Sequence, residues 1–147
     1  MPPKNQGFTL IELLVVIILI TVILAAALVM FSGATAKGRD AKREEDMKSL
    51  HSALGLYINQ LTFYPICPQE ELVDGKTDCL SAALLEAKAT SGVPRDPKHQ
   101  TNEACGGQGA FVYCYQSQNN GASYTLRYHL ETDTVQGKSA GWQTQSP

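Results

Sequence analysis

The stretch Gly7-Phe8-Thr9-Leu10-Ile11-Glu12 opens a long apolar segment near the start of the chain. Residues 8–31 contain neither proline nor glycine, and Glu12 is the one charged residue among them. At about 1.5 Å per residue they would form a helix of roughly 36 Å, longer than the roughly 30 Å hydrocarbon core of a bilayer. We therefore expect residues 8–31 to form a membrane-spanning helix.

Glu12 is the feature that a simple membrane anchor would lack. A carboxylate within an apolar segment is costly to bury unless a partner neutralises it, and no partner is obvious in the intact sequence. Cleavage between Gly7 and Phe8 would create an α-amino group one helical turn from Glu12, and a neighbouring subunit could present the same group. We therefore predict that proteolytic processing supplies the charge that Glu12 needs.

Residues 7–17, GFTLIELLVVI, resemble the leader and methylation motif of type IV pilins and of type II secretion pseudopilins. The resemblance is strict over about residues 7–27 and looser beyond them. It implies that a prepilin peptidase cleaves after Gly7 and methylates Phe8, and that Glu12 acts in assembly. It also implies a homo-oligomeric helical filament, with an inner-membrane assembly platform and its ATPase as further partners. Membrane lipid would surround the helix before assembly.

The remaining sequence predicts one small head that continues from the helix. We assign residues 1–7 to a leader, 8–31 to the transmembrane and assembly helix, 32–64 to its amphipathic continuation and 65–147 to a disulfide-stapled head. Apolar residues recur at spacings of three and four along the continuation, which we expect to end before Pro65. This stripe consists of Met47, Leu50, Leu54, Ile58 and Leu61, widened by Tyr57. We expect the charged residues on the other sides of this helix, including Arg43 and Asp46, to be solvated.

Two stretches near the C-terminus alternate as strands do, around a turn at residues 119–122. We predict that one face of this hairpin covers the helical stripe, with Cys114 on the other face. That face would carry Phe111, Tyr113, Tyr115, Tyr124, Leu126, Tyr128 and Leu130. A short helix at residues 80–89 and a third strand around residues 134–142 would complete the head. The fold class is therefore α+β and pilin-like, with a long N-terminal helix packed on a small antiparallel sheet.

The cysteines and the basic residues give opposite indications of where the head lies. Four cysteines without a metal-binding spacing indicate two disulfides and an oxidising compartment. Three pairings are possible; we favour Cys67 with Cys79 and Cys105 with Cys114. The basic residues Lys37, Arg39, Lys42 and Arg43 follow the span, which by simple counting would favour a cytoplasmic head. We give more weight to the motif and the cysteines, and predict a single-pass inner-membrane protein with an extracytoplasmic head, which assembly moves into a periplasmic or extracellular filament.

Other functions find less support in the sequence. A secretory signal peptide would have a shorter apolar core. A monomeric, membrane-anchored binding module is the main alternative to a filament subunit. The net charge of −2 does not favour nucleic-acid binding, and no catalytic motif indicates an enzyme.

We also predict neither a metal nor another cofactor. Major pseudopilins of type II secretion often share an acidic calcium-binding loop near the C-terminus. The corresponding residues 131–138 offer two carboxylates and a lysine, whereas calcium takes six to eight oxygen ligands. The three histidines, His51, His99 and His129, share no spacing typical of a metal site.

Overall fold

The structure is a computed structural model that describes residues 7–100 and 103–147, without the side chains of residues 29, 30 and 32. The chain divides into two compact units, with the division after Thr35. Residues 1–6 of the predicted leader lie outside the described residues.

The first element, α1 (Leu10–Leu61), is continuous across the division and across Gly33 and Gly38. A Cβ built at either glycine meets no atom within 4 Å, so packing in this chain does not require glycine at these positions. The predicted end of the helix before Pro65 was wrong by three residues. Thr62 adopts a left-handed φ of 64°, which ends α1 before the proline is reached.

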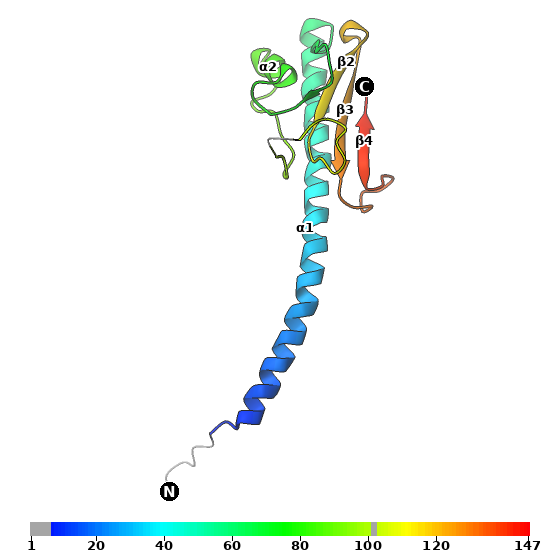
Figure 1. The fold of residues 1–147 in the computed structure, drawn as a ribbon. Helices are drawn as coiled ribbons and strands as arrows, with labels where there is room; N and C mark the ends of the chain where they lie inside the picture. The colour runs from blue at the N-terminus through cyan, green and yellow to red at the C-terminus, as the bar shows by residue number, and fades with distance from the viewer. Residues whose placement is uncertain (1–6, 101–102) are drawn as a thin grey trace. The chain divides into compact units, whose positions relative to one another are not determined.

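Four antiparallel strands form one sheet in the order β1-β2-β3-β4 (Figure 1). They are β1 (Glu71–Leu72), β2 (Cys114–Gln118), β3 (Ser123–Leu130) and β4 (Gly141–Gln145). The predicted hairpin is β2 and β3, joined by the 3-10 turn η1 (Asn119–Gly121). The predicted third strand starts later than expected, at Gly141, and β1 was not predicted because two residues carry no detectable alternation.

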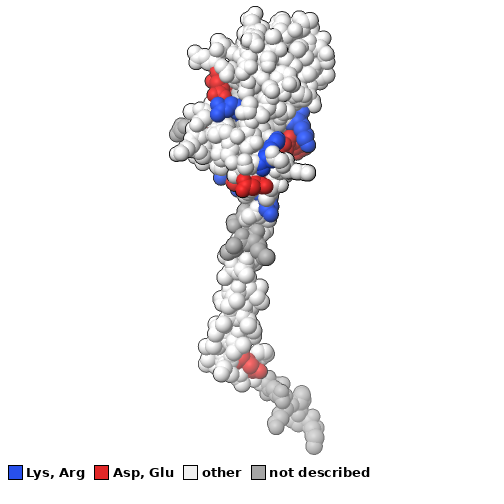
Figure 2. Space-filling view, turned by 90° about the vertical axis from the view of Figure 1, so that its right-hand side faces the viewer, with Lys and Arg blue, Asp and Glu red and all other residues white. Residues whose placement is uncertain are grey.

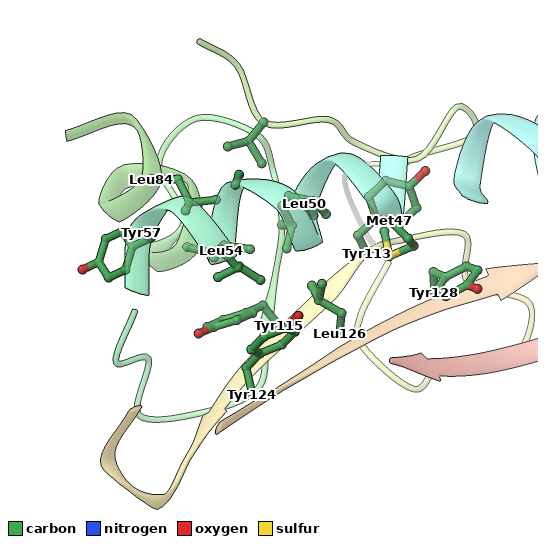
Figure 3. Packing of buried hydrophobic residues seen from close by; sticks show 14 of the residues in the cluster. Met47, Leu50, Leu54, Tyr57, Leu84, Tyr113, Tyr115, Tyr124, Leu126 and Tyr128 are labelled. Carbon is green, nitrogen blue, oxygen red and sulfur yellow. The ribbon is translucent and has the colours of Figure 1, made fainter. Parts of the chain in front are cut away.

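The core lies between one face of this sheet and the C-terminal half of α1 (Figure 3). Met47, Leu50, Leu54 and Tyr57 are buried, which confirms most of the predicted stripe. Opposite them lie the buried side chains of Tyr113, Tyr115, Tyr124, Leu126, Tyr128 and Leu130. Three members of the prediction lie outside the buried core. Leu61 is 40% exposed and Ile58 is half-buried. Phe111, which precedes β2, is half-buried and contacts Arg43 and His129.

The short helix α2 (Cys79–Glu86) was predicted at residues 80–89, and it lies beside α1 in Figure 1. Asp78 caps its first turn by accepting a hydrogen bond from the Ser81 backbone N–H at 2.9 Å. Disulfides join Cys67 to Cys79 and Cys105 to Cys114, the two sequence-local pairs. Such cross-links restrict the unfolded chain, and each contributes about 2–4 kcal/mol to stability in typical cases.

Candidate assembly site

Thr9 and Glu12 form a capping box at the start of α1. The Glu12 carboxylate oxygen Oε2 accepts hydrogen bonds from the Thr9 backbone N–H at 3.0 Å and from the Thr9 hydroxyl at 2.8 Å. In return, the Glu12 backbone N–H donates to the Thr9 hydroxyl at 3.3 Å. Reciprocal bonds of this kind satisfy donors that a helix start leaves open. Glu12 therefore has a hydrogen-bonding partner within the chain, where no partner was obvious from the sequence.

The surface around Glu12 is apolar and uncovered. Every residue from Gly7 to Leu28 is exposed in the isolated chain, and 82% of the surface of Phe8 is accessible to solvent. Phe8, Ile11, Val15 and Val16 line a shallow hollow beside the Glu12 carboxylate. The surface of this part of α1 is almost entirely white in Figure 2, since Glu12 is its one charged residue. An apolar surface of this extent needs lipid or other protein around it.

The predicted cleavage position lies at the accessible start of this surface. Gly7 and Phe8 precede the first helical residue, Leu10, and both are exposed. A Cβ built at Gly7 meets no atom within 4 Å, and Gly7 is not among the glycines with a left-handed φ. The fold of this chain therefore does not require glycine at this position, and a requirement would have to come from a partner.

Residues 2–28 match the family model described as the prokaryotic N-terminal methylation motif. The chain carries the signal motif of type IV pilins and pseudopilins. This motif implies processing by a prepilin peptidase and filament assembly in general, and it marks structural proteins. The α+β layout described above fits the pilin-like fold. Neither a curated protein nor a solved structure matches the chain.

Of the described residues, those of α1 form one helix that is long and apolar enough to cross a membrane, by length and composition. The apolar helix and the motif together fit anchoring in a membrane.

The second half of α1 carries a buried ion cluster that the sequence analysis missed. Arg43 is 0% exposed, although it was expected to be solvated. Its guanidinium donates to both carboxylate oxygens of Asp96 at 2.6 and 3.0 Å, to Asp40 at 2.7 Å and to Glu131 at 2.8 Å. Asp96 opens the turn at residues 96–99, which the His99 backbone N–H closes on the Asp96 carbonyl, and Glu131 directly follows β3, so one side chain joins three distant parts of the sequence.

Neighbouring groups complete this cluster. Arg39 donates two hydrogen bonds to Glu131 at 2.7 and 2.6 Å, and the Lys98 ammonium lies 3.3 Å from the same carboxylate. The hydrogen bonds from Arg39 and Arg43 outweigh burial and lower the pKa of Glu131 to about 2. Although burial opposes ionisation of Asp40, hydrogen bonds from Glu131, Thr132 and Arg43 lower its pKa. The cluster therefore keeps Glu131 and Asp40 ionised at neutral pH.

This cluster includes two of the basic residues that, by simple counting, would favour a cytoplasmic head. Arg39 and Arg43 pair with Glu131, Asp40 and Asp96, while Lys42 lies 3.1 Å from both Glu45 and Asp46. Three of the four basic residues after the apolar segment thus have acidic partners inside the folded head. Packing of the head therefore accounts for Arg43, which is fully buried, whereas Lys42 lies on the surface.

Tyrosine hydroxyls add a second set of polar contacts between the sheet and α1. Tyr113 donates to Asp46 at 2.8 Å, and Tyr124 lies 2.6 Å from a ring nitrogen of His51. A tyrosine ring can be buried at low cost when its hydroxyl finds a partner. The strand alternation predicted the buried rings, but not these partners.

The disulfides also exclude one apparent metal site. Cys67, Glu71 and Cys79 are close enough to share an ion among the described residues. Both sulfurs are in the Cys67–Cys79 disulfide, and Glu71 accepts a hydrogen bond from the Cys79 backbone N–H at 3.1 Å. Metals bind thiolates, so this group is a structural staple.

Proposed function

We propose that this chain is the precursor of a filament subunit, either a type IV pilin or a type II secretion pseudopilin. A prepilin peptidase would cleave it between Gly7 and Phe8 and methylate Phe8. The main support is an apolar helix surface, exposed from Gly7 to Leu28, that carries one carboxylate beside the cleavage position. A membrane anchor needs the apolar surface but has no use for the carboxylate.

Assembly would exchange one apolar environment for another. Before assembly, lipid surrounds residues 8–31; in the filament, the helices of neighbouring subunits would replace the lipid. Because lipid is as apolar as these side chains, close packing and polar contacts rather than the hydrophobic effect must favour the filament. A pairing of opposite charges between subunits would provide such a contact and fix the axial position of one subunit against the next.

The capping box leaves Glu12 able to make this contact. Both hydrogen bonds from Thr9 go to Oε2, and Oε1 accepts none from the residues that the structure describes. A neighbour's Phe8 amine could therefore bind Oε1 while Thr9 keeps the carboxylate oriented. A hydrogen bond between two charged groups is about twice as strong as one between neutral groups, which suits a contact that sets register.

The remaining regions would take the roles that their sequences predict. Residues 1–7 would be the removed leader, 32–64 the link between anchor and head, and 65–147 the exposed part of the subunit. Two disulfides favour a head outside the cytoplasm, and the filament would then be periplasmic or extracellular. An inner-membrane platform and its ATPase would drive assembly.

Replacing Glu12 tests the proposed register contact. Glu12→Gln keeps the size and much of the hydrogen bonding of the side chain but removes its charge. We expect normal membrane insertion and at least a tenfold loss of sheared or secreted filament, measured by fractionation and immunoblotting. Glu45→Gln, which neutralises an exposed carboxylate of the head, is the matched control and should assemble normally. Normal filaments from Glu12→Gln would refute the role of Glu12.

A second experiment separates the filament subunit from a monomeric anchored binding module. Gly7→Leu should block cleavage, leave the leader in place and abolish assembly, because the Phe8 amine never forms. Intact-mass measurement of the wild-type protein from cells should show a chain that starts at a methylated Phe8. A fully active population with its leader intact would instead support the anchored binding module.

A further inference from the structure

The connection between β3 and β4 is held to α1 by an internal ammonium group. The Lys138 Nζ atom lies 2.8 Å from each carboxylate oxygen of Glu44, and it also donates to the Tyr128 hydroxyl. The same hydroxyl donates to Glu44. Lys138 and Glu44 are half-buried and Tyr128 is buried, and the Lys138 backbone N–H closes a turn on the Val135 carbonyl at 3.1 Å. Lys138 thus binds groups from α1, from β3 and from its own loop.

The carboxylates of this connection are already engaged. Glu131 binds Arg39, Arg43 and Lys98. Asp133 accepts a hydrogen bond from the Ala140 backbone N–H at 2.5 Å. A calcium ion takes six to eight oxygen ligands at about 2.3–2.6 Å, and would have to displace these cations and donors. The residues of this loop therefore do not fit the calcium site that the resemblance to major pseudopilins suggests.

We propose that Lys138 is a built-in counter-cation that fixes residues 131–140 against α1, so that this loop closes without a bound divalent ion. The geometry carries this inference, since one ammonium group meets both oxygens of a carboxylate and a phenol oxygen. A bound divalent cation would require such a set of oxygen atoms to be free. Lys138 instead supplies the positive charge as part of the chain itself. The closure of the loop therefore does not depend on the concentration of a free ion.

The charge states in this contact agree with the geometry. Although burial opposes its charge, hydrogen bonds to Glu44 and Tyr128 raise the pKa of Lys138. Burial, together with the hydrogen bond to Glu44, raises the pKa of Tyr128 to about 12. Near neutral pH the lysine is therefore an ammonium donor and the tyrosine a neutral hydroxyl.

Hydrogen–deuterium exchange of the full-length chain in detergent micelles tests the proposal. In the wild type, exchange of the amides in residues 131–140 should be the same with millimolar calcium chloride as with a chelator. Lys138→Met should speed it about tenfold, because hydrogen bonds to charged groups are among the stronger ones. Lys76→Met, at an exposed lysine whose side chain makes no hydrogen bond or ion pair with the described residues, is the control and should change nothing. Loss of protection on chelation, or unchanged exchange in Lys138→Met, would overturn the proposal.

Lys138→Met could also speed exchange by loosening the whole head. A conservative variant and an exchange of the two charges separate that effect from loss of the Lys138 contact. Lys138→Arg keeps the cation and should keep protection within about twofold of the wild type. The double variant Glu44→Lys with Lys138→Glu should recover most of the protection that either single change loses. Equal loss in Lys138→Arg and Lys138→Met would contradict a role for the charge.

Discussion

Glu12 and Arg43 are charged residues of the same helix in opposite surroundings. Glu12 is exposed, and its partner in the chain is Thr9, three residues before it. Arg43 is completely buried, and three carboxylates surround its guanidinium. The apolar segment therefore leaves its one charge available, whereas the head satisfies the charge of Arg43 internally.

This difference separates two uses of a charge. A buried ion pair gives little net stability, because desolvation offsets most of the attraction. Removing one partner is nevertheless costly, since the other charges stay buried without compensation. Arg43 therefore specifies how the turn at residues 96–99 and the end of β3 are placed against α1. Glu12 does not position any part of the folded head, so its charge is available for contacts with another molecule.

Removing the buried charge of Arg43 gives the largest expected effect. Arg43→Met keeps much of the side-chain volume but leaves Asp40, Asp96 and Glu131 without their shared cation. We expect the free energy of unfolding of the head to fall by about 3–5 kcal/mol. Urea denaturation of the full-length chain in detergent, followed by near-ultraviolet circular dichroism of the buried tyrosines, measures this change.

Two controls make the comparison sharp. Lys37→Met removes an exposed cation from the same helix and should change the free energy of unfolding by less than about 0.5 kcal/mol. Glu12→Gln should likewise leave the stability of the head unchanged while it blocks assembly. A stable Arg43→Met head, or a Glu12→Gln head as unstable as Arg43→Met, would remove the distinction between the two charges.

The same contrast explains which features could be predicted from the sequence. Residues 8–31 have a composition that excludes most alternatives, and the spacing of Gly7, Phe8 and Glu12 is specific. The helical stripe and the β2–β3 hairpin follow from local periodicity, which a single sequence displays. These features required no knowledge of contacts between distant residues.

The ion cluster could not be predicted in the same way. Arg43, Asp96 and Glu131 are far apart in sequence, and each alone is typical of a solvated position. Only the fold brings the turn at residues 96–99 and the end of β3 to the same side of α1. One signal was present, since Arg43 lies four residues before Met47 and so on the face of α1 that the stripe occupies. Lys138, which pairs with Glu44 from far along the chain, was likewise hidden from local patterns.

Acid should weaken the head through Glu131, with an effect smaller than that of removing Arg43. Its folded pKa of about 2 lies below the ordinary value of 4.5, so its ionised form stabilises the fold above pH 4.5. That contribution, on the order of 2 kcal/mol, is lost as the pH falls from 4.5 towards 2. Unfolding at successive pH values should show this decline in the wild type.

Replacing Glu131 tests whether this residue causes the pH dependence of stability. The variant Glu131→Gln should be less stable at neutral pH and should decline less between pH 4.5 and 2. Glu45→Gln removes a carboxylate that is largely exposed, and should retain the wild-type profile. An unchanged profile in Glu131→Gln would mean that other carboxylates of the head control its acid stability.

The smallest expected effect concerns Thr9, and it tests whether Glu12 is available in the way proposed. Thr9→Val keeps the shape of the side chain but removes the hydroxyl that meets the Glu12 carboxylate at 2.8 Å. Loss of a capping residue costs a helix about 1 kcal/mol, and here it would release the first turn without reaching the head. We expect unchanged urea denaturation of the head and a filament yield reduced several-fold, measured by shearing and immunoblotting.

Thr21→Val, which removes a hydroxyl bonded to the Ile18 carbonyl within the same helix, is the matched control and should assemble normally. If Thr9→Val assembled as well as Thr21→Val, orientation of Glu12 by the capping box would be unnecessary, and the charge alone would account for its role.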